Sequence, residues 1–264
     1  MALLKSVGEG GANRREDVKV IQAALNLASH EEFKLPNKID VDGKINAITK
    51  KAIIEFQKNV VGMDKPDGRV DPAGKTSLTL QGSIKKTNTL VLDSLTAIMA
   101  HGTKSNIQKF LPLFNTLLPK YQVNTGLRIA HFLAQVGHES ASFTYTEEIA
   151  SGKAYEGRTD LGNTNKGDGV RFKGRGLIQL TGRDNYSLYG KYANLDLLTE
   201  PNQKVISSTP LYALDVSLWF WNQKRLSRFA DKDDIRTITL RVNGGLNGFP
   251  DRKLYLSRAK YFLV

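Results

Sequence analysis

The sequence predicts a mostly α-helical protein in two parts, a small N-terminal domain and a larger C-terminal domain. Apolar residues recur at helical spacing in several stretches, and no region of the chain is rich in strand-like alternation. A polar, basic segment without an apolar period separates these stretches. We therefore predict domains at residues 1–82 and 93–264, joined by a linker at 83–92.

The N-terminal domain is predicted to hold three short helices. Apolar residues three or four apart mark the first over 18–28 and the second over 48–56. Asp42-Gly43 precedes the second helix. Asp67-Gly68 precedes a third, which we expect to open at Asp71-Pro72. Because Asp-Gly suits a turn that needs a positive φ, the repeat suggests two similar turn-helix units.

The C-terminal domain is predicted to be built from longer helices, over 91–99, 107–118, 125–139, 211–221 and 234–242. The stretch 125–139 gives the clearest pattern, with Ile129, Phe132, Leu133 and Val136 on one face. Residues 151–176 are rich in glycine and should form loops, with a short strand near 177–180. Of Trp219 and Trp221, one should pack in the core, and the other in the core or beneath a sugar.

Composition narrows the possible functions. The chain has no cysteine, so disulfides, thiol catalysis and zinc-thiolate sites are excluded. Its net charge is +12. Positive charge favours polyanionic partners, but it is scattered and accompanies no nucleic-acid motif, so we expect no nucleic-acid partner. No apolar run suits a signal peptide or a membrane span. We expect a monomer without stable membrane insertion that needs no metal or other cofactor.

Glu139 and Glu148 are the candidate catalytic pair. Glu139 falls on or beside the apolar face of the predicted helix 125–139, where burial would favour a protonated general acid. Glu148 lies in a polar stretch, where it would stay ionised and could activate water. Two such carboxylates can hydrolyse a glycosidic bond, at a separation of roughly 6.5–9.5 Å in an inverting enzyme. Two surface glutamates would be the simpler interpretation.

Five sequence segments, the first of which contains Glu139, occur in order. They are His138-Glu139-Ser140, the glycine-rich loop that follows it, the stretch from Phe172 to Thr181, Asn243-Gly244-Gly245 and Asp251-Arg252. Together they resemble glycoside hydrolase family 19, which contains plant-type chitinases and the related lysozymes of phages and bacteria. The resemblance covers roughly residues 93–264. It implies an α-helical fold with two lobes around a groove, and hydrolysis with inversion.

The resemblance also implies roles for single residues. Glu139 would be the general acid, Glu148 the base, with Glu147 as a possible substitute, and Thr181 would hold the attacking water. Arg252 would lie near the base. The implied substrate-binding residues are His138, Tyr155, Arg158, Gln179, Asn185, Asn243 and Arg252. Gly182-Arg183 stands where plant chitinases carry Trp, and their disulfides are missing, which favours the lysozyme branch.

The N-terminal segment is similar to a peptidoglycan-binding domain. Asp42-Gly43, the run from Ile54 to Gln57, and Asp67-Gly68 carry the similarity. Such a domain would tether the enzyme to its polymer and raise the effective substrate concentration. A helical domain without binding activity is the alternative.

These features predict a muralytic enzyme. It would cut the β-1,4 bond between N-acetylmuramic acid and N-acetylglucosamine, with peptidoglycan as both substrate and anchor. We expect a phage endolysin, made in the host cytoplasm and acting in the periplasm after release through a holin. A chitinase, a catalytically inactive wall-binding protein and, more remotely, a nucleic-acid binder are the alternatives.

Overall fold

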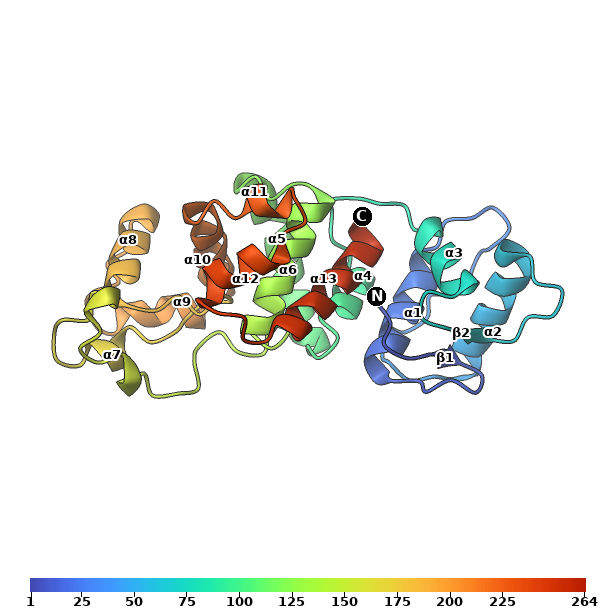
Figure 1. Cartoon of the computed structure of the whole chain (residues 1–264), viewed down its shortest axis with the longest axis horizontal. Helices are drawn as coiled ribbons and strands as arrows, with labels where there is room; N and C mark the ends of the chain where they lie inside the picture. Colours follow the sequence, from blue (N-terminus) through green and yellow to red (C-terminus); the bar gives the residue numbers. More distant parts are fainter.

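The computed structural model describes all residues, 1–264, and is mostly helical, as predicted. Its only strands are two short ones, β1 (Val7–Gly8) and β2 (Arg69–Val70), which pair antiparallel with Val7 opposite Val70. The molecule is elongated, with the N-terminal domain at one end, a helical bundle in the middle and α7 and α8 at the other end (Figure 1). No helix is long and apolar enough to span a membrane.

The N-terminal domain contains the three predicted helices, α1 (Arg15–Leu27), α2 (Ala47–Phe56) and α3 (Lys75–Ser83). A π-helical turn at Gln57–Val61 extends α2. The third helix begins at Lys75 and not at Asp71-Pro72, because residues 71–74 form a turn in which Gly74 N donates to Asp71 O at 3.0 Å.

The two Asp-Gly turns are held in the same way, as their repetition in the sequence suggested. Gln22 Oε1 accepts from Gly43 N at 2.9 Å, and Gln57 Oε1 accepts from Gly68 N at 2.8 Å. Both glutamines are fully buried. Each Nε2 also donates to the Asp of its turn, at 3.0 Å for Gln22 and 2.6 Å for Gln57. A buried glutamine therefore fixes each turn.

The predicted helices of the C-terminal domain form its central bundle. They are α4 (Leu92–Ile98), α5 (Lys104–Lys120), α6 (Gly126–Glu139), α10 (Pro210–Gln223) and α12 (Ile235–Asn243). One further helix, α13 (Phe249–Leu263), belongs to this bundle and lies along α6. Trp221 meets the Phe132 ring edge-on at 5.4 Å, and Trp219 packs against tyrosines. Both tryptophans are buried, so neither forms the floor of a sugar site.

Four helices of this domain were not expected, besides α13. They are α7 (Asp168–Arg171), α8 (Arg183–Ala193), α9 (Val205–Ser208) and α11 (Ser227–Ala230). Short 3-10 turns lie at Lys153–Tyr155, Thr159–Leu161 and Asn202–Lys204. The strand expected near 177–180 is absent. Arg175 and Leu180 exchange backbone hydrogen bonds of 2.8 and 3.1 Å, so the chain folds back on itself there and has no partner strand.

The two domains pack against each other. Helix α1 contacts α4 (Figure 1), and Lys19 Nζ donates to Ala100 O at 2.7 Å in a buried hydrogen bond. Between α3 and α4 the connecting segment is also fixed, because Lys86 Nζ donates to Tyr261 O at 2.7 Å. Lys86 Nζ also donates to Gln81 O at 3.1 Å, so the predicted linker is bound to both domains.

Candidate functional site

Helix α6 positions Glu139 at its last residue. Thr125 caps the start of the helix by accepting from Arg128 N. Near its end, a Cβ on Gly137 would lie 2.8 Å from the Tyr255 ring of α13. Glycine weakens a helix interior, so its presence here is explained by this close approach. The contact of α13 with the last turn of α6 holds Glu139 against the bundle.

A short left-handed turn follows α6. Ala141, Ser142 and Phe143 have φ values of 47°, 58° and 68°, a conformation that costs non-glycine residues roughly 1–2 kcal/mol each. Two contacts hold it. Ser140 Oγ accepts from Phe143 N at 2.9 Å, and Ser142 Oγ lies 2.7 Å from Tyr255 Oη. This turn redirects the chain, so that Glu148 returns to the same groove from another segment.

Glu139 contacts a buried guanidinium. Arg252 Nη2 donates to Glu139 Oε1 at 2.5 Å, and Arg252 Nη1 donates to Gln135 Oε1 at 2.7 Å. Arg252 is fully buried. The resemblance implied a place for Arg252 near the base and a contact with substrate; in the structure its charge is directed at the carboxylate of Glu139, the expected acid. Glu139 lies in a charged environment and not in an apolar one.

Glu148 is held by neutral donors. Tyr155 Oη donates to Glu148 Oε1 at 3.0 Å, and Gly174 N donates to Glu148 Oε2 at 3.1 Å. The backbone of Glu148 also donates to Gly174 O at 2.9 Å. Burial, together with the hydrogen bond to Glu148 and its charge, raises the pKa of Tyr155, so the hydroxyl keeps its proton and remains a donor.

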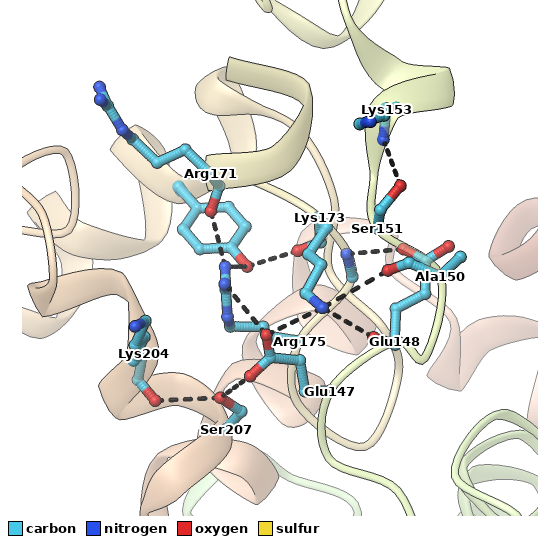
Figure 2. Close-up of polar contacts among 12 residues, drawn as sticks. Glu147, Glu148, Ala150, Ser151, Lys153, Arg171, Lys173, Arg175, Lys204 and Ser207 are labelled. Atoms are coloured by element: carbon cyan, nitrogen blue, oxygen red, sulfur yellow. Dashed lines mark hydrogen bonds and ion pairs between the residues drawn. The ribbon is translucent and has the colours of Figure 1, made fainter. Parts of the chain in front are cut away.

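Glu147 forms ion pairs and a hydrogen bond with residues other than those that hold the carboxylate of Glu148 (Figure 2). Lys173 Nζ lies 3.1 Å and Arg175 Nη2 3.3 Å from its Oε1, and Ser207 Oγ donates to Oε2 at 2.9 Å. Burial alone would raise the pKa of Glu147, but the hydrogen bonds from Lys173 and Ser207 and the charge of Arg175 lower it overall. Neighbouring residues in the sequence thus have different surroundings.

The two candidate carboxylates line one cavity of about 350 Å³. A second cavity of about 280 Å³ shares six of its lining residues, so the two form one groove. The shared residues are Tyr155, Ile178, Gln179, Thr181, Val242 and Asn243. Glu139 and Asn243 come from the ends of α6 and α12, whereas the residues from 148 to 181 come from the glycine-rich loops. The groove therefore lies between the bundle and the loops.

Most residues that the sequence singled out meet in this groove. Thr181 Oγ1 donates to Gln179 O at 2.9 Å, which leaves its lone pairs free to accept from a water. Asn185 Nδ2 donates to Thr181 O at 2.7 Å, and Arg158 pairs with Asp160 at the rim of the second cavity. Gln179 Oε1 is buried without a hydrogen-bond partner, so an acceptor is available to a ligand.

His138 differs from the other predicted substrate contacts. It lines neither cavity, and its Nδ1 lies 2.7 Å from Asp251 Oδ2. Sequence reasoning missed Gln135, which lies one helical turn before Glu139 and orients Arg252. It also missed the apolar wall formed by Ile178 and Val242. No group of three or more His, Cys, Asp or Glu side chains is arranged to hold a metal ion.

A domain that brings two carboxylates from separate segments to one open groove meets the basic requirement of a glycoside hydrolase. The family model described as "Chitinase class I" matches residues 121–236, and that of a putative peptidoglycan binding domain matches residues 14–78. A glycosyl hydrolase family 19 domain-containing protein of Haemophilus influenzae is 33% identical over 158 residues, covering 48% of this chain and 76% of that protein. The chain belongs to glycoside hydrolase family 19.

Other relatives and solved structures agree with this assignment. An endochitinase of Arabidopsis thaliana is 37% identical over 135 residues, which cover 51% of this chain but only 45% of the plant protein. Chitinase C from Streptomyces griseus has the same fold, with a TM-score of 0.54 at 18% identity over 75% of this chain and 81% of that one. A class IV chitinase from Zea mays gives 0.51 at 21% identity, covering 64% and 90%.

Proposed function

We propose that this glycoside hydrolase cuts the β-1,4 bond between N-acetylmuramic acid and N-acetylglucosamine in bacterial peptidoglycan, with inversion. The observation that carries the proposal is the meeting of Glu139 and Glu148 in one groove, on a chain that also has a peptidoglycan-binding domain. The anchor and the groove then act on the same polymer.

In the proposed mechanism, Glu139 is the general acid and Glu148 the general base. Glu139 gives its proton to the glycosidic oxygen as the bond to the anomeric carbon breaks. Glu148 removes a proton from a water on the opposite face of the sugar, and this water forms the new bond. Tyr155 and Gly174 fix one geometry for the Glu148 carboxylate. In this mechanism, Thr181 accepts a hydrogen bond from the attacking water.

Arg252 has two roles in this proposal. It holds Glu139 in place before the reaction, and it stabilises the carboxylate that remains after Glu139 has given up its proton. Since Arg252 is fully buried, its charge is poorly screened by solvent. Gln135 accepts a hydrogen bond from Nη1 of the same guanidinium and so helps to orient it.

The first test compares Glu139→Gln, Glu148→Gln and Glu147→Gln on outer-membrane-permeabilised cells. We expect the first two to abolish lysis while the far-UV circular dichroism stays that of the wild type. Glu147→Gln should lose stability but keep activity at low temperature, since Glu147 does not line the groove. Near-normal lysis by Glu139→Gln would disprove the assignment of the acid.

The second test identifies the bond. Mass spectrometry of digested peptidoglycan should find new reducing ends on N-acetylmuramic acid, and proton NMR should find the α-anomer formed first. Reducing ends on N-acetylglucosamine would contradict the muramidase assignment, and cut peptide bonds would contradict glycoside hydrolysis altogether.

A chitinase is the second candidate, because most of the curated relatives are named endochitinases. Rates on chitin oligomers and on purified peptidoglycan distinguish the two. One relative, 35% identical, is named an inactive endochitinase, so the wall-binding alternative needs the same assay. We also propose the role of an endolysin, made in a host cytoplasm and released to the periplasm through a holin. Lysis from within on co-expression of a holin, and none without it, would support this role.

A further inference from the structure

A cavity of about 660 Å³ lies between the two domains, away from the groove, and is larger than either cavity of the groove. The N-terminal domain contributes the start of α1 and the loop 38–44. The C-terminal domain contributes α4 and residues 102–104, which lead into α5. The catalytic proposal makes no use of this cavity, and eight of the residues that line it are charged.

The charged side chains around the cavity divide into those with partners and those without. Lys38 pairs with Asp93 at 3.4 Å, and Lys19 Nζ is bound to Ala100 O. Asp42 accepts from Lys44 N of its own turn at 2.8 Å and from Gln22 Nε2 of α1 at 3.0 Å. These groups have protein partners and form the walls of the cavity.

Three cations and one carboxylate remain. Arg15, Lys44 and Lys104 line the cavity, and their side chains make no ion pair or hydrogen bond. Asp40 is the only acidic side chain of the lining that also lacks an ion pair and a hydrogen bond. The excess of unpaired positive charge is contributed by both domains, with Arg15 and Lys44 on one side and Lys104 on the other.

A helix terminus adds to this charge. Helix α5 is 17 residues long and begins at Lys104, with Thr103 as its cap, so its N-terminus reaches the cavity. The aligned peptide dipoles give that end a partial positive charge. The cavity therefore suits a ligand that carries more than one carboxylate, and Asp40 adds a place for one amino group.

We propose that this cavity binds the carboxylate-bearing peptide stem of peptidoglycan. The inference rests on the proposed function, since it takes peptidoglycan to be the substrate. In that polymer the stems carry several carboxylates and a free amine, whereas chitin is an uncharged glycan. A stem held here would contact both domains at once and would distinguish peptidoglycan from chitin at a distance from the groove.

The test measures binding of a free stem tetrapeptide, released from peptidoglycan by an amidase, to the full chain by isothermal titration calorimetry. The double variant Lys44→Gln/Lys104→Gln should raise Kd at least tenfold. The control is Lys58→Gln/Lys109→Gln, which removes two exposed lysines without ion pairs, one in each domain and neither in the cavity. The control should bind as the wild type does. Binding should weaken with added salt, because it rests on exposed charges.

Three outcomes would overturn the proposal. The wild type could fail to bind the stem at millimolar concentration, or the double variant could bind as tightly as the control. In the third outcome, inorganic polyphosphate binds as tightly as the stem, and the double variant weakens the binding of both by the same factor. This result would indicate a positively charged patch without selectivity for the stem. Since no bond is cut in this assay, its result is independent of lysis by the Glu139 variants, and the two proposals can fail separately.

Discussion

The buried ion pair between Asp17 and Arg258 is predicted to couple the unfolding of the two domains. Arg258 Nη2 lies 3.7 Å from Asp17 Oδ1, and both side chains are buried. Asp17 also accepts hydrogen bonds from the backbone of Leu4 at 3.1 Å and Lys5 at 3.0 Å. Burial lowers the pKa of Arg258, and the charge of Asp17 opposes this effect. The carboxylate therefore supports the cation across the domain interface.

Arg258→Met removes the cation and leaves Asp17 charged and buried. Removing one partner of such a pair costs about 3–5 kcal/mol of unfolding free energy. Because the two backbone donors remain on Asp17, we expect the lower end, about 3 kcal/mol. For a chain of this size, this corresponds to a fall in Tm of roughly 6–12 °C.

Calorimetry and urea titration measure this effect, with tryptophan fluorescence and circular dichroism followed together. Both tryptophans lie in the C-terminal domain, so the two signals should coincide in the wild type and separate in Arg258→Met. Asp17→Asn/Arg258→Met should lose less than the sum of the single changes. The matched control is Arg128→Met, which breaks a partly exposed pair with Asp231 and should cost about 1 kcal/mol or less. A loss below about 1 kcal/mol in Arg258→Met would refute the reasoning.

Three further predictions concern the site and its support. Gly248→Ala should destabilise more than Gly244→Ala. Both glycines have φ near +70°, so at Gly244, where a Cβ would meet no other atom, only backbone strain of about 1 kcal/mol is expected. At Gly248 a Cβ would also lie 2.0 Å from His138 Cε1. Urea titration measures the loss of unfolding free energy in both variants. Burial lowers the pKa of His131. Below about pH 6.5 the unfolded chain therefore binds a proton at His131 that the folded chain does not, and the free energy of unfolding should fall by up to ~1.4 kcal/mol per pH unit. Between pH 7.5 and 5.5, Tm should change less in His131→Gln than in the wild type. Tyr155→Phe removes a hydrogen bond to a carboxylate and should lower kcat roughly tenfold or more, with the fold unchanged, as initial rates on purified peptidoglycan would reveal.

Each of these has a result that would count against it. Equal losses at 244 and 248 would mean that the histidine moves without cost. A slope of Tm against pH that is the same in the wild type and the His131 variant would place the titration elsewhere. Full activity of Tyr155→Phe would mean that Gly174 alone positions the base.

The helix that carries Glu139 was predictable because one of its faces is apolar and the opposite one is polar. Helix α13 was not, because it is surrounded by other parts of the protein and buries residues on several sides, Arg252 and Arg258 among them. A helix without a single apolar stripe shows no helical period in its sequence.

The candidate site divides in the same way. The types and order of its residues were visible in the sequence, but its pairings were not. Arg252 reaches Glu139 across 113 residues, a contact that depends on the packing of α13 along α6. The choice between Glu147 and Glu148 depends on Lys173 and Arg175, which become neighbours of Glu147 only in the folded chain.

The fixed connection between the domains has a consequence for how the enzyme meets its polymer. A flexible tether lets an active site search a sphere around its anchor. With Lys86 bound to the end of α13 and Lys19 bound to the turn after α4, the connection between the two domains is not a free tether. Under the proposed function, the anchoring point and the bond that is cut then lie at a constant distance from each other along the wall.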